Sequence, residues 1–131
     1  MQNITVDGNT YRVHVVPDTV KRIAELIEGP VSGDMLSDRH ERDLSGTKFT
    51  YQMRIEPDWV NYADYDSLFS LLATPTDSHS VTLPFGQSTI TFDAMIQSVD
   101  DGLIGNALGV NRWHGMTVRF VPIEPQWRPT T

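Results

Sequence analysis

Residues 46–58 ("GTKFTYQMRIEPD") alternate apolar and polar side chains with a period of two. The apolar positions are Phe49, Tyr51, Met53 and Ile55. Successive side chains of a β-strand point to opposite faces of its sheet, so this pattern predicts a strand with one dry and one wet face. Sheets with one dry face are usually antiparallel, and this constrains the fold more than any other feature of the sequence.

Shorter segments repeat this alternation, and turn residues separate them. These segments are residues 4–6, 11–15, 79–85, 89–99 and 113–123. Asp7-Gly8 lies between the first two, where glycine accepts the positive φ of a tight hairpin turn. We therefore expect a mainly β fold of about six or seven antiparallel strands, either a β-sandwich or a partly closed barrel.

Residues 56–75 predict the one main helix of this α+β chain. Asn61 is placed to cap it, Asp64 falls in its first turn, where the helix dipole favours a carboxylate, and Pro75 ends it. One stripe of apolar residues follows the helical period: Tyr62, Tyr65, Phe69 and Leu72. We expect this helix to cover one open end or face of the sheet.

Residues 20–27 fit two structures. The apolar side chains fall on one helical face: Val20, Ile23, Ala24 and Ile27. A period of two, with Lys21 and Glu25 beside Ile23 on one face, is also tolerable. Periodicity and composition by themselves favour the helix.

The composition limits the classes of function. A length of 131 residues suits one domain, 1–131, with an irregular, proline-bounded tail from about residue 122. The absence of cysteine excludes thiol catalysis and cysteine-ligated zinc. A net charge of −7 argues against specific nucleic-acid binding, because an acidic surface repels phosphates. We see no signal peptide and no apolar run long enough to span a membrane.

The sequence contains no pattern that indicates catalysis or metal binding. Its four histidines lack metal-ligand spacing to one another: His14, His40, His79 and His114. Ser78 precedes His79 directly, but neighbours on a strand point to opposite faces and cannot easily pair as nucleophile and base. The acidic residues of 34–43 lack the spacing of a calcium loop. We expect a protein that is not an enzyme and that uses no metal or cofactor.

Three groups of apolar residues fall where loops or a tail are expected. They are Leu103, Ile104, Leu108 and Val110 between two predicted strands, Met35 and Leu36 in the first long loop, and Trp127 beyond the last strand. Loops usually run over the surface and are polar. These residues either fold back onto the core or contact a partner subunit, and the sequence leaves both alternatives open.

Four stretches follow one another in a recognisable order. They are "ITVDGNTYRV", "RDLSGTKFTYQMRI", "YDSLFSLLATPTDSHSVTLPFGQSTITFDAMI" and "NRWHGMTVRFVPIEP". Gly46-Thr47 precedes an aromatic-rich strand, and Trp113 opens a closing strand that runs into Pro122. In these features most of the chain resembles small structural proteins of tailed phages and prophages of Gram-positive bacteria, which are similar to siphophage tail-tube and distal-tail proteins.

This resemblance implies a non-catalytic virion protein, made in the bacterial cytoplasm, that forms part of a tail tube, distal tail or baseplate. It implies a tail-tube type of β fold in which residues 20–27 form a strand, against the helix that periodicity favours. It also implies homo-oligomeric rings, typically hexameric, that contact other tail proteins. In such rings Met35, Leu36 and residues 103–110 would contact neighbouring subunits, and the wet face of 46–58 would face a lumen or a neighbour.

A carbohydrate- or ligand-binding β-sandwich module is the alternative. Such a module needs an exposed aromatic platform, and the candidates are Trp59, Trp113 and Trp127. A flat exposed row of aromatic rings would favour this alternative, whereas three buried tryptophans would remove it.

Overall fold

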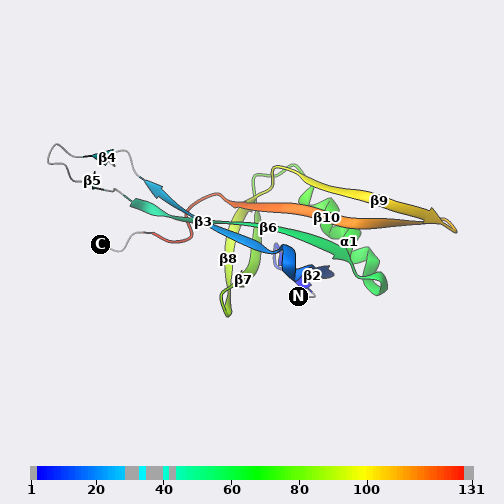
Figure 1. Cartoon of the computed structure of the whole chain (residues 1–131). Coiled ribbons are helices and arrows are strands. Elements are labelled where there is room, and N and C mark those ends of the chain that lie inside the picture. Colours follow the sequence, from blue (N-terminus) through cyan, green and yellow to red (C-terminus); the bar gives the residue numbers. More distant parts are fainter. Residues whose placement is uncertain (1–2, 29–32, 35–39, 42–43, 129–131) are drawn as a thin grey trace.

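Two long strands, β6 (Leu44–Pro57) and β10 (Val110–Pro122), organise the molecule. The computed structural model describes residues 3–28, 33–34, 40–41 and 44–128. The two strands run antiparallel and pair in the middle, with Met116 opposite Ile55 and Phe120 opposite Tyr51. Both strands continue past this crossing, and their extensions point in opposite directions (Figure 1).

Four shorter strands close a barrel around the crossing. They are β1 (Asn3–Val6), β2 (Asn9–Val15), β7 (His79–Phe85) and β8 (Ser88–Met95). The order β6-β2-β1-β7-β8-β10, completed by the β6–β10 pairing, makes a six-stranded antiparallel barrel. The prediction of a mainly β antiparallel fold with one helix is confirmed, and the barrel rather than the sandwich is the form that it takes.

The first extension of the barrel is a hairpin that we call the β3 arm. In it β3 (Lys21–Glu28) pairs with the first half of β6, from Lys21 opposite Gln52 to Ile27 opposite Gly46. A 3-10 turn, η1 (Pro17–Thr19), separates β3 from β2 along the same edge of β6. The short β4 (Gly33–Asp34) and β5 (His40–Glu41) pair with each other farther along this hairpin.

The helix that periodicity favours for residues 20–27 is therefore wrong, and the strand implied by the resemblance is correct. The reason lies in the pairing, because β6 offers a continuous edge for the backbone of this segment. A weak helix propensity is readily overridden by such a tertiary ladder.

The second extension is a hairpin that we call the β9 arm. In it β9 (Val99–Ala107) pairs with β10 from Val118 opposite Val99 to Val110 opposite Ala107, with register shifts on both sides of Trp113. The prediction of a loop between the strands expected at 89–99 and 113–123 is wrong. That segment is a β-hairpin, and its last strand begins at Val110 rather than at Trp113.

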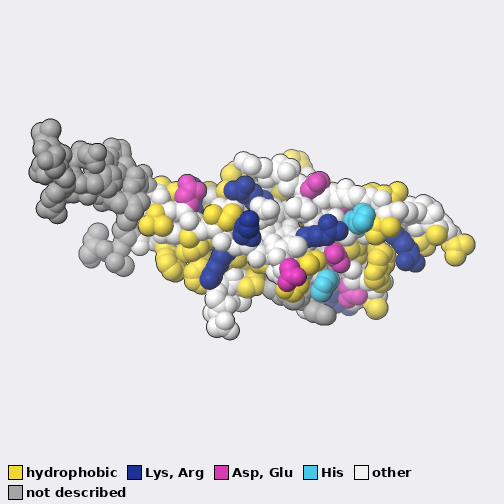
Figure 2. Space-filling view, viewed as in Figure 1, with side chains coloured by type: hydrophobic (Ala, Val, Ile, Leu, Met, Phe, Trp, Pro, Cys, Tyr) yellow, Lys and Arg dark blue, Asp and Glu magenta, His cyan; other side chains and the backbone are white. Residues whose placement is uncertain are grey.

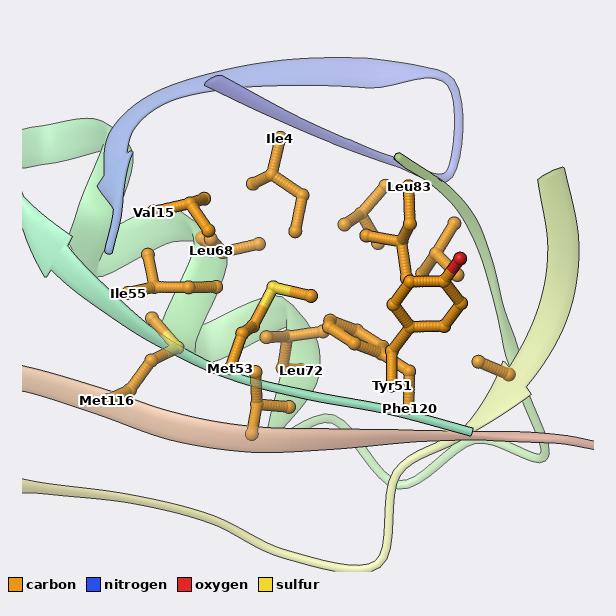
Figure 3. Close-up of a cluster of buried hydrophobic side chains, with 14 of the residues drawn as sticks. Ile4, Val15, Tyr51, Met53, Ile55, Leu68, Leu72, Leu83, Met116 and Phe120 are labelled. Carbon is orange, nitrogen blue, oxygen red and sulfur yellow. The ribbon is translucent and has the colours of Figure 1, made fainter. Parts of the chain in front are cut away.

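Helix α1 (Tyr62–Leu72) follows a 3-10 turn, η2 (Trp59–Asn61), and packs against β2 and β6. Leu68 and Leu72 are buried, and Figure 3 shows both among the side chains of the barrel. The helix begins after Asn61 as predicted. The Asn61 side chain, however, makes no capping bond to the helix and donates instead to an Asp58 carboxylate oxygen at 3.0 Å.

The barrel core contains the side chains that the alternation of β6 predicts. Tyr51, Met53 and Ile55 are 1% exposed or less, and Figure 3 shows them pointing from β6 toward Ile4 and Leu83. The Tyr51 hydroxyl donates to the Pro84 carbonyl at 2.6 Å, so its burial leaves no polar group unpaired.

Candidate subunit interface

The β9 arm exposes four of the apolar residues that the sequence analysis selected. Leu103 is 50% exposed, Ile104 55%, Val110 54% and Leu108 102%. Hydrophobic side chains lie at the far end of this arm in Figure 2. Of the two alternatives for this segment, folding back onto the core is therefore wrong. Contact with a partner subunit stays a prediction.

The tip of the β9 arm has an unusual residue in its turn. Leu108 has a φ of 55° and Gly109 a φ of 77°, which are the left-handed values of a two-residue type I′ turn. Such positions suit glycine, asparagine or aspartate, because a large side chain in this region is strained. A leucine here is locally unfavourable and points fully into solvent.

The outer edge of β9 lacks the features that normally protect an edge strand. In the part of the chain that the structure describes, β9 pairs only with β10. Residues 102–107 ("GLIGNA") contain no charged side chain and no proline. Natural edge strands usually carry such residues to prevent pairing with another chain.

Aromatic side chains near α1 hold the base of the β9 arm. The Trp113 backbone N–H donates to the Tyr62 hydroxyl at 2.7 Å, and the Tyr65 hydroxyl donates to the Asp101 carboxylate at 3.0 Å. Burial raises the pKa of Tyr65 strongly, and the hydrogen bond to the Asp101 carboxylate raises it further. Tyr65 therefore stays protonated, and its hydrogen bond to Asp101 joins α1 to β9.

Trp127, the remaining predicted interface residue, lies beside the other arm. Its backbone exchanges hydrogen bonds with Thr47 of β6 at 2.9 and 3.3 Å. Its ring packs edge-on against Phe49 at 4.9 Å and Phe85 at 5.6 Å, and 53% of the residue stays exposed. Trp127 thus seals this end of the barrel and still presents surface to solvent. The second role suggested by the sequence, docking on a neighbouring subunit, stays a prediction.

The residue before Trp127 anchors the C-terminal tail. The Gln126 side chain accepts from the Phe49 backbone N–H and donates to the Phe49 carbonyl, both at 2.9 Å. A side-chain amide thus imitates the backbone of a neighbouring strand. The tail that follows β10 is therefore fixed to β6 by Gln126 and by the Trp127 backbone.

A groove runs between β8 and this tail. It has a volume of about 590 Å³, and its lining consists of Ile90, Thr91, Phe92, Asp93 and residues 123–127. The groove exists because the tail leaves β8 after Ile123, whose N–H donates to the Asp93 carbonyl at 3.1 Å, and crosses to β6. No local sequence pattern indicates this groove, since its two walls meet only through the closed barrel.

Met35 and Leu36, the other predicted interface residues, lie outside the described residues. The three tryptophans form no single platform. Trp59 and Trp127 are about half exposed, but Trp59 follows the end of β6 at Pro57, whereas Trp127 pairs with Thr47 near the start of that strand. Trp59 also has Arg112 over its ring at 5.1 Å. The tryptophans thus form neither the exposed row that would favour a ligand-binding module nor the buried set that would remove this alternative.

One pair of titratable side chains escaped the sequence analysis. His79 is 4% exposed, and its Nδ1 donates to an Asp7 carboxylate oxygen at 2.7 Å. Burial acts to raise the pKa of Asp7, but the hydrogen bonds from His79 and from the Ser80 N–H outweigh it, so this pKa lies below its usual value. Seventy-two residues separate the two partners, and no local signal connects them.

The His79–Asp7 pair lacks the access that a catalytic pair needs. The other ring nitrogen of His79, Nε2, is buried and has no hydrogen-bond partner among the described residues. A general base must reach a substrate proton within hydrogen-bond distance, and a buried Nε2 cannot do so. The pair instead joins the β1–β2 turn to the start of β7, where β1 and β7 share only two residue pairs.

No group of three or more histidines and carboxylates is placed to hold a metal ion among the described residues. In the same part of the chain, no helix has the length and apolarity required to cross a membrane. A scan against protein-family models finds no match, and a search of curated proteins also finds none.

Proposed function

We propose that this chain is a non-catalytic structural protein of a phage or prophage virion, a tail or tail-adjacent component of the tail-tube type. It assembles into homo-oligomeric rings and contacts other tail proteins. One observation carries the proposal. The β9 arm projects beyond the barrel with Leu103, Ile104 and Leu108 exposed and with no charge over residues 102–107. Exposed apolar surface of this kind marks a protein contact.

The arrangement of the two arms supports assembly rather than catalysis. Both arms are extensions of strands that cross in the barrel, so they reach in opposite directions from one core. A subunit with two opposed arms can contact neighbours on both sides. The net charge of −7 suits a tube through which DNA passes without binding, since like charges repel.

Light scattering after size exclusion, over a wide range of protein concentration, tests the proposal. We expect large species that negative-stain images resolve as rings or tubes. A strict monomer at every concentration, which also fails to enter tails when supplied to a growing phage assembly, would contradict it.

One observation favours the alternative of a ligand-binding module. Trp127 is half exposed and lines the groove of about 590 Å³, a size typical of small-molecule sites. Titration of oligosaccharides against tryptophan fluorescence separates the two functions. Saturable quenching by one saccharide, in a protein that does not assemble, would favour the module.

A further inference from the structure

We infer that Leu108 anchors a head-to-tail contact, in which the tip of the β9 arm of one copy inserts into the groove between β8 and the C-terminal tail of a second copy. The inference rests on the proposed self-assembly and assigns the two surfaces that meet. The groove is the one lined by Ile90, Phe92, Ile123 and Trp127.

The first step is the comparison of two turns with the same backbone. Asp7-Gly8 has φ values of 52° and 80°, and Leu108-Gly109 has 55° and 77°. The first turn has the residues that this geometry favours. The second has a leucine, which gains nothing from its own chain, since it is 102% exposed. Strain kept at an exposed position indicates a role that the isolated subunit does not use.

The second step concerns the open edge of β8. The Asp93 carbonyl faces the tail and accepts from Ile123, and backbone groups on one edge of a strand recur at every second residue. Thr91 and Thr89 therefore present their N–H and C=O groups to the same side. In the described part of the chain, β10 pairs with β8 only at Ala94 and Met95. An extended segment from a second copy can pair with this edge.

The third step is chemical complementarity. The groove offers the apolar surfaces of Ile90, Phe92, Ile123 and Trp127 to a leucine. Its charged lining residues, Asp93 and Glu124, are both acidic, although Arg128 lies 3.4 Å from Glu124. The arm has no acidic residue from 102 to 112 and ends that stretch with Arg112. The arm therefore brings no carboxylate into an acidic groove.

The fourth step is the placement of the two surfaces. The tip of the β9 arm lies at one end of the molecule, and β8 and the C-terminal tail lie toward the other end (Figure 1). A copy that inserts its tip into a neighbour keeps its own groove open for a third copy. Such heterologous contacts continue until the rotation closes a ring, or they extend as a filament.

Two variants test the contact. Leu108→Asn removes the anchor and places a favoured residue in the turn, so its melting temperature should be unchanged or higher. Ile123→Glu adds a carboxylate to the groove at a residue that is 44% exposed and outside the core. Val60→Asn, at an 89% exposed residue beside α1, is the matched control.

Light scattering of each variant and of their mixture gives the readout. We expect each test variant alone to need at least about tenfold more protein than the wild type to assemble, as hot-spot losses predict, and the control to assemble normally. Mixed one to one, Leu108→Asn supplies an intact groove and Ile123→Glu an intact tip. We therefore expect the mixture to form a 1:1 heterodimer that grows no further.

The outcomes separate this contact from the proposed function. If both test variants assemble like the wild type, or if their mixture stays monomeric while the wild type assembles, this contact is overturned and the proposed assembly stands. If the wild type stays monomeric at every concentration, the contact is overturned together with self-assembly.

Discussion

The two arms of this protein have the same construction and different surfaces. In each arm a long strand of the barrel extends outward, and one partner strand pairs along one of its edges. Both partner strands expose apolar residues, among them Leu26 at 49% in β3 and Ile104 at 55% in β9. Apolar exposure therefore does not distinguish them.

Charge distinguishes the two arms. The exposed residues of β3 include Lys21, Arg22 and Glu25, whereas residues 102–107 of β9 include none with a charge. Charged side chains prevent an edge strand from pairing with another chain. The β3 arm therefore has the charges of an edge strand that stays in solvent, whereas the outer half of the β9 arm is suited to being covered by another chain.

The largest expected effect comes from the glycine where the β9 arm leaves the barrel. Gly115 has a φ of 119°, and an added Cβ would lie 2.7 Å from the Ile55 carbonyl oxygen in β6. Because this neighbour is central barrel backbone that cannot move away, Gly115→Ala should lower the free energy of unfolding by about 2–4 kcal/mol. Urea denaturation measures the change.

Two other glycines provide the comparison. A Cβ at Gly46, in the β3 arm, would lie 2.5 Å from the Trp127 carbonyl oxygen and 2.7 Å from Pro125. Relief of this clash would break the hydrogen bonds between the tail and Thr47 but would leave the pairing of the barrel strands intact. We expect Gly46→Ala to cost less than Gly115→Ala. Gly105 has nothing within 4 Å, so Gly105→Ala should change stability by less than about 0.5 kcal/mol. Equal losses at Gly115 and Gly105 would show that the close approach to β6 does not matter.

A smaller effect should follow from loosening the tail on the β3 arm. Gln126→Ala removes two hydrogen bonds to Phe49, so we expect a loss of about 1–2 kcal/mol and a red shift of Trp127 fluorescence. Glu124→Ala is the control, because its ion pair with Arg128 is exposed and weak. If Gln126→Ala changes neither the free energy of unfolding nor the fluorescence, the hydrogen bonds between Gln126 and Phe49 do not stabilise β6.

Adding a charge to the edge strand β9 and removing one from the edge strand β3 should reverse which arm promotes self-association. Ile104→Lys gives β9 the protection that β3 has, and we expect roughly tenfold weaker self-association, or about 1.4 kcal/mol. Glu25→Val removes protection from β3 and should increase aggregation. Light scattering of both variants at matched concentration provides the measurement. If both variants associate more weakly than the wild type, or if neither does, the β9 arm is not the associating edge and the charges of β3 are not its protection.

The smallest effect concerns pH and the Asp7-Gly8 turn. Hydrogen bonds from His79 and Ser80 lower the pKa of Asp7 in the folded state below the unfolded pKa of about 3.8. The ionised carboxylate therefore stabilises the fold fully at pH values above this unfolded pKa. This stabilisation should disappear as the pH falls through the lower folded pKa. Asp7→Asn should therefore be less stable than the wild type at pH 6, and the difference should shrink toward pH 2.5. Urea denaturation midpoints of both proteins over that pH range measure this difference in stability. A difference that stays constant from pH 6 to pH 2.5 would show that the ionisation of Asp7 does not contribute to stability.

Prediction from sequence succeeded where a strand has one dry face. Phe49, Tyr51, Met53 and Ile55 are buried as the period of two predicts, and the Asp7-Gly8 turn follows from local residue chemistry. Helix α1 begins after Asn61 and ends before Pro75 as predicted, although Asn61 makes no capping bond. These features can be predicted without their distant partners, because the burial of one strand face and the geometry of a turn depend on residues close together in the sequence.

The two arms, the closure of the barrel and the groove between β8 and the tail follow only from the tertiary structure. Residues 21–26 of β3 are all exposed, and most of β9 is exposed too. Because β3 and most of β9 have no dry face, their sequences lack a strong alternation of apolar and polar residues and predict a helix or a loop instead. Likewise Asp7 with His79, and the tail with β6, meet only because the barrel brings distant segments together. Local residue patterns fix which strand faces are dry, whereas the pairing of remote strands fixes which surfaces remain exposed for a partner.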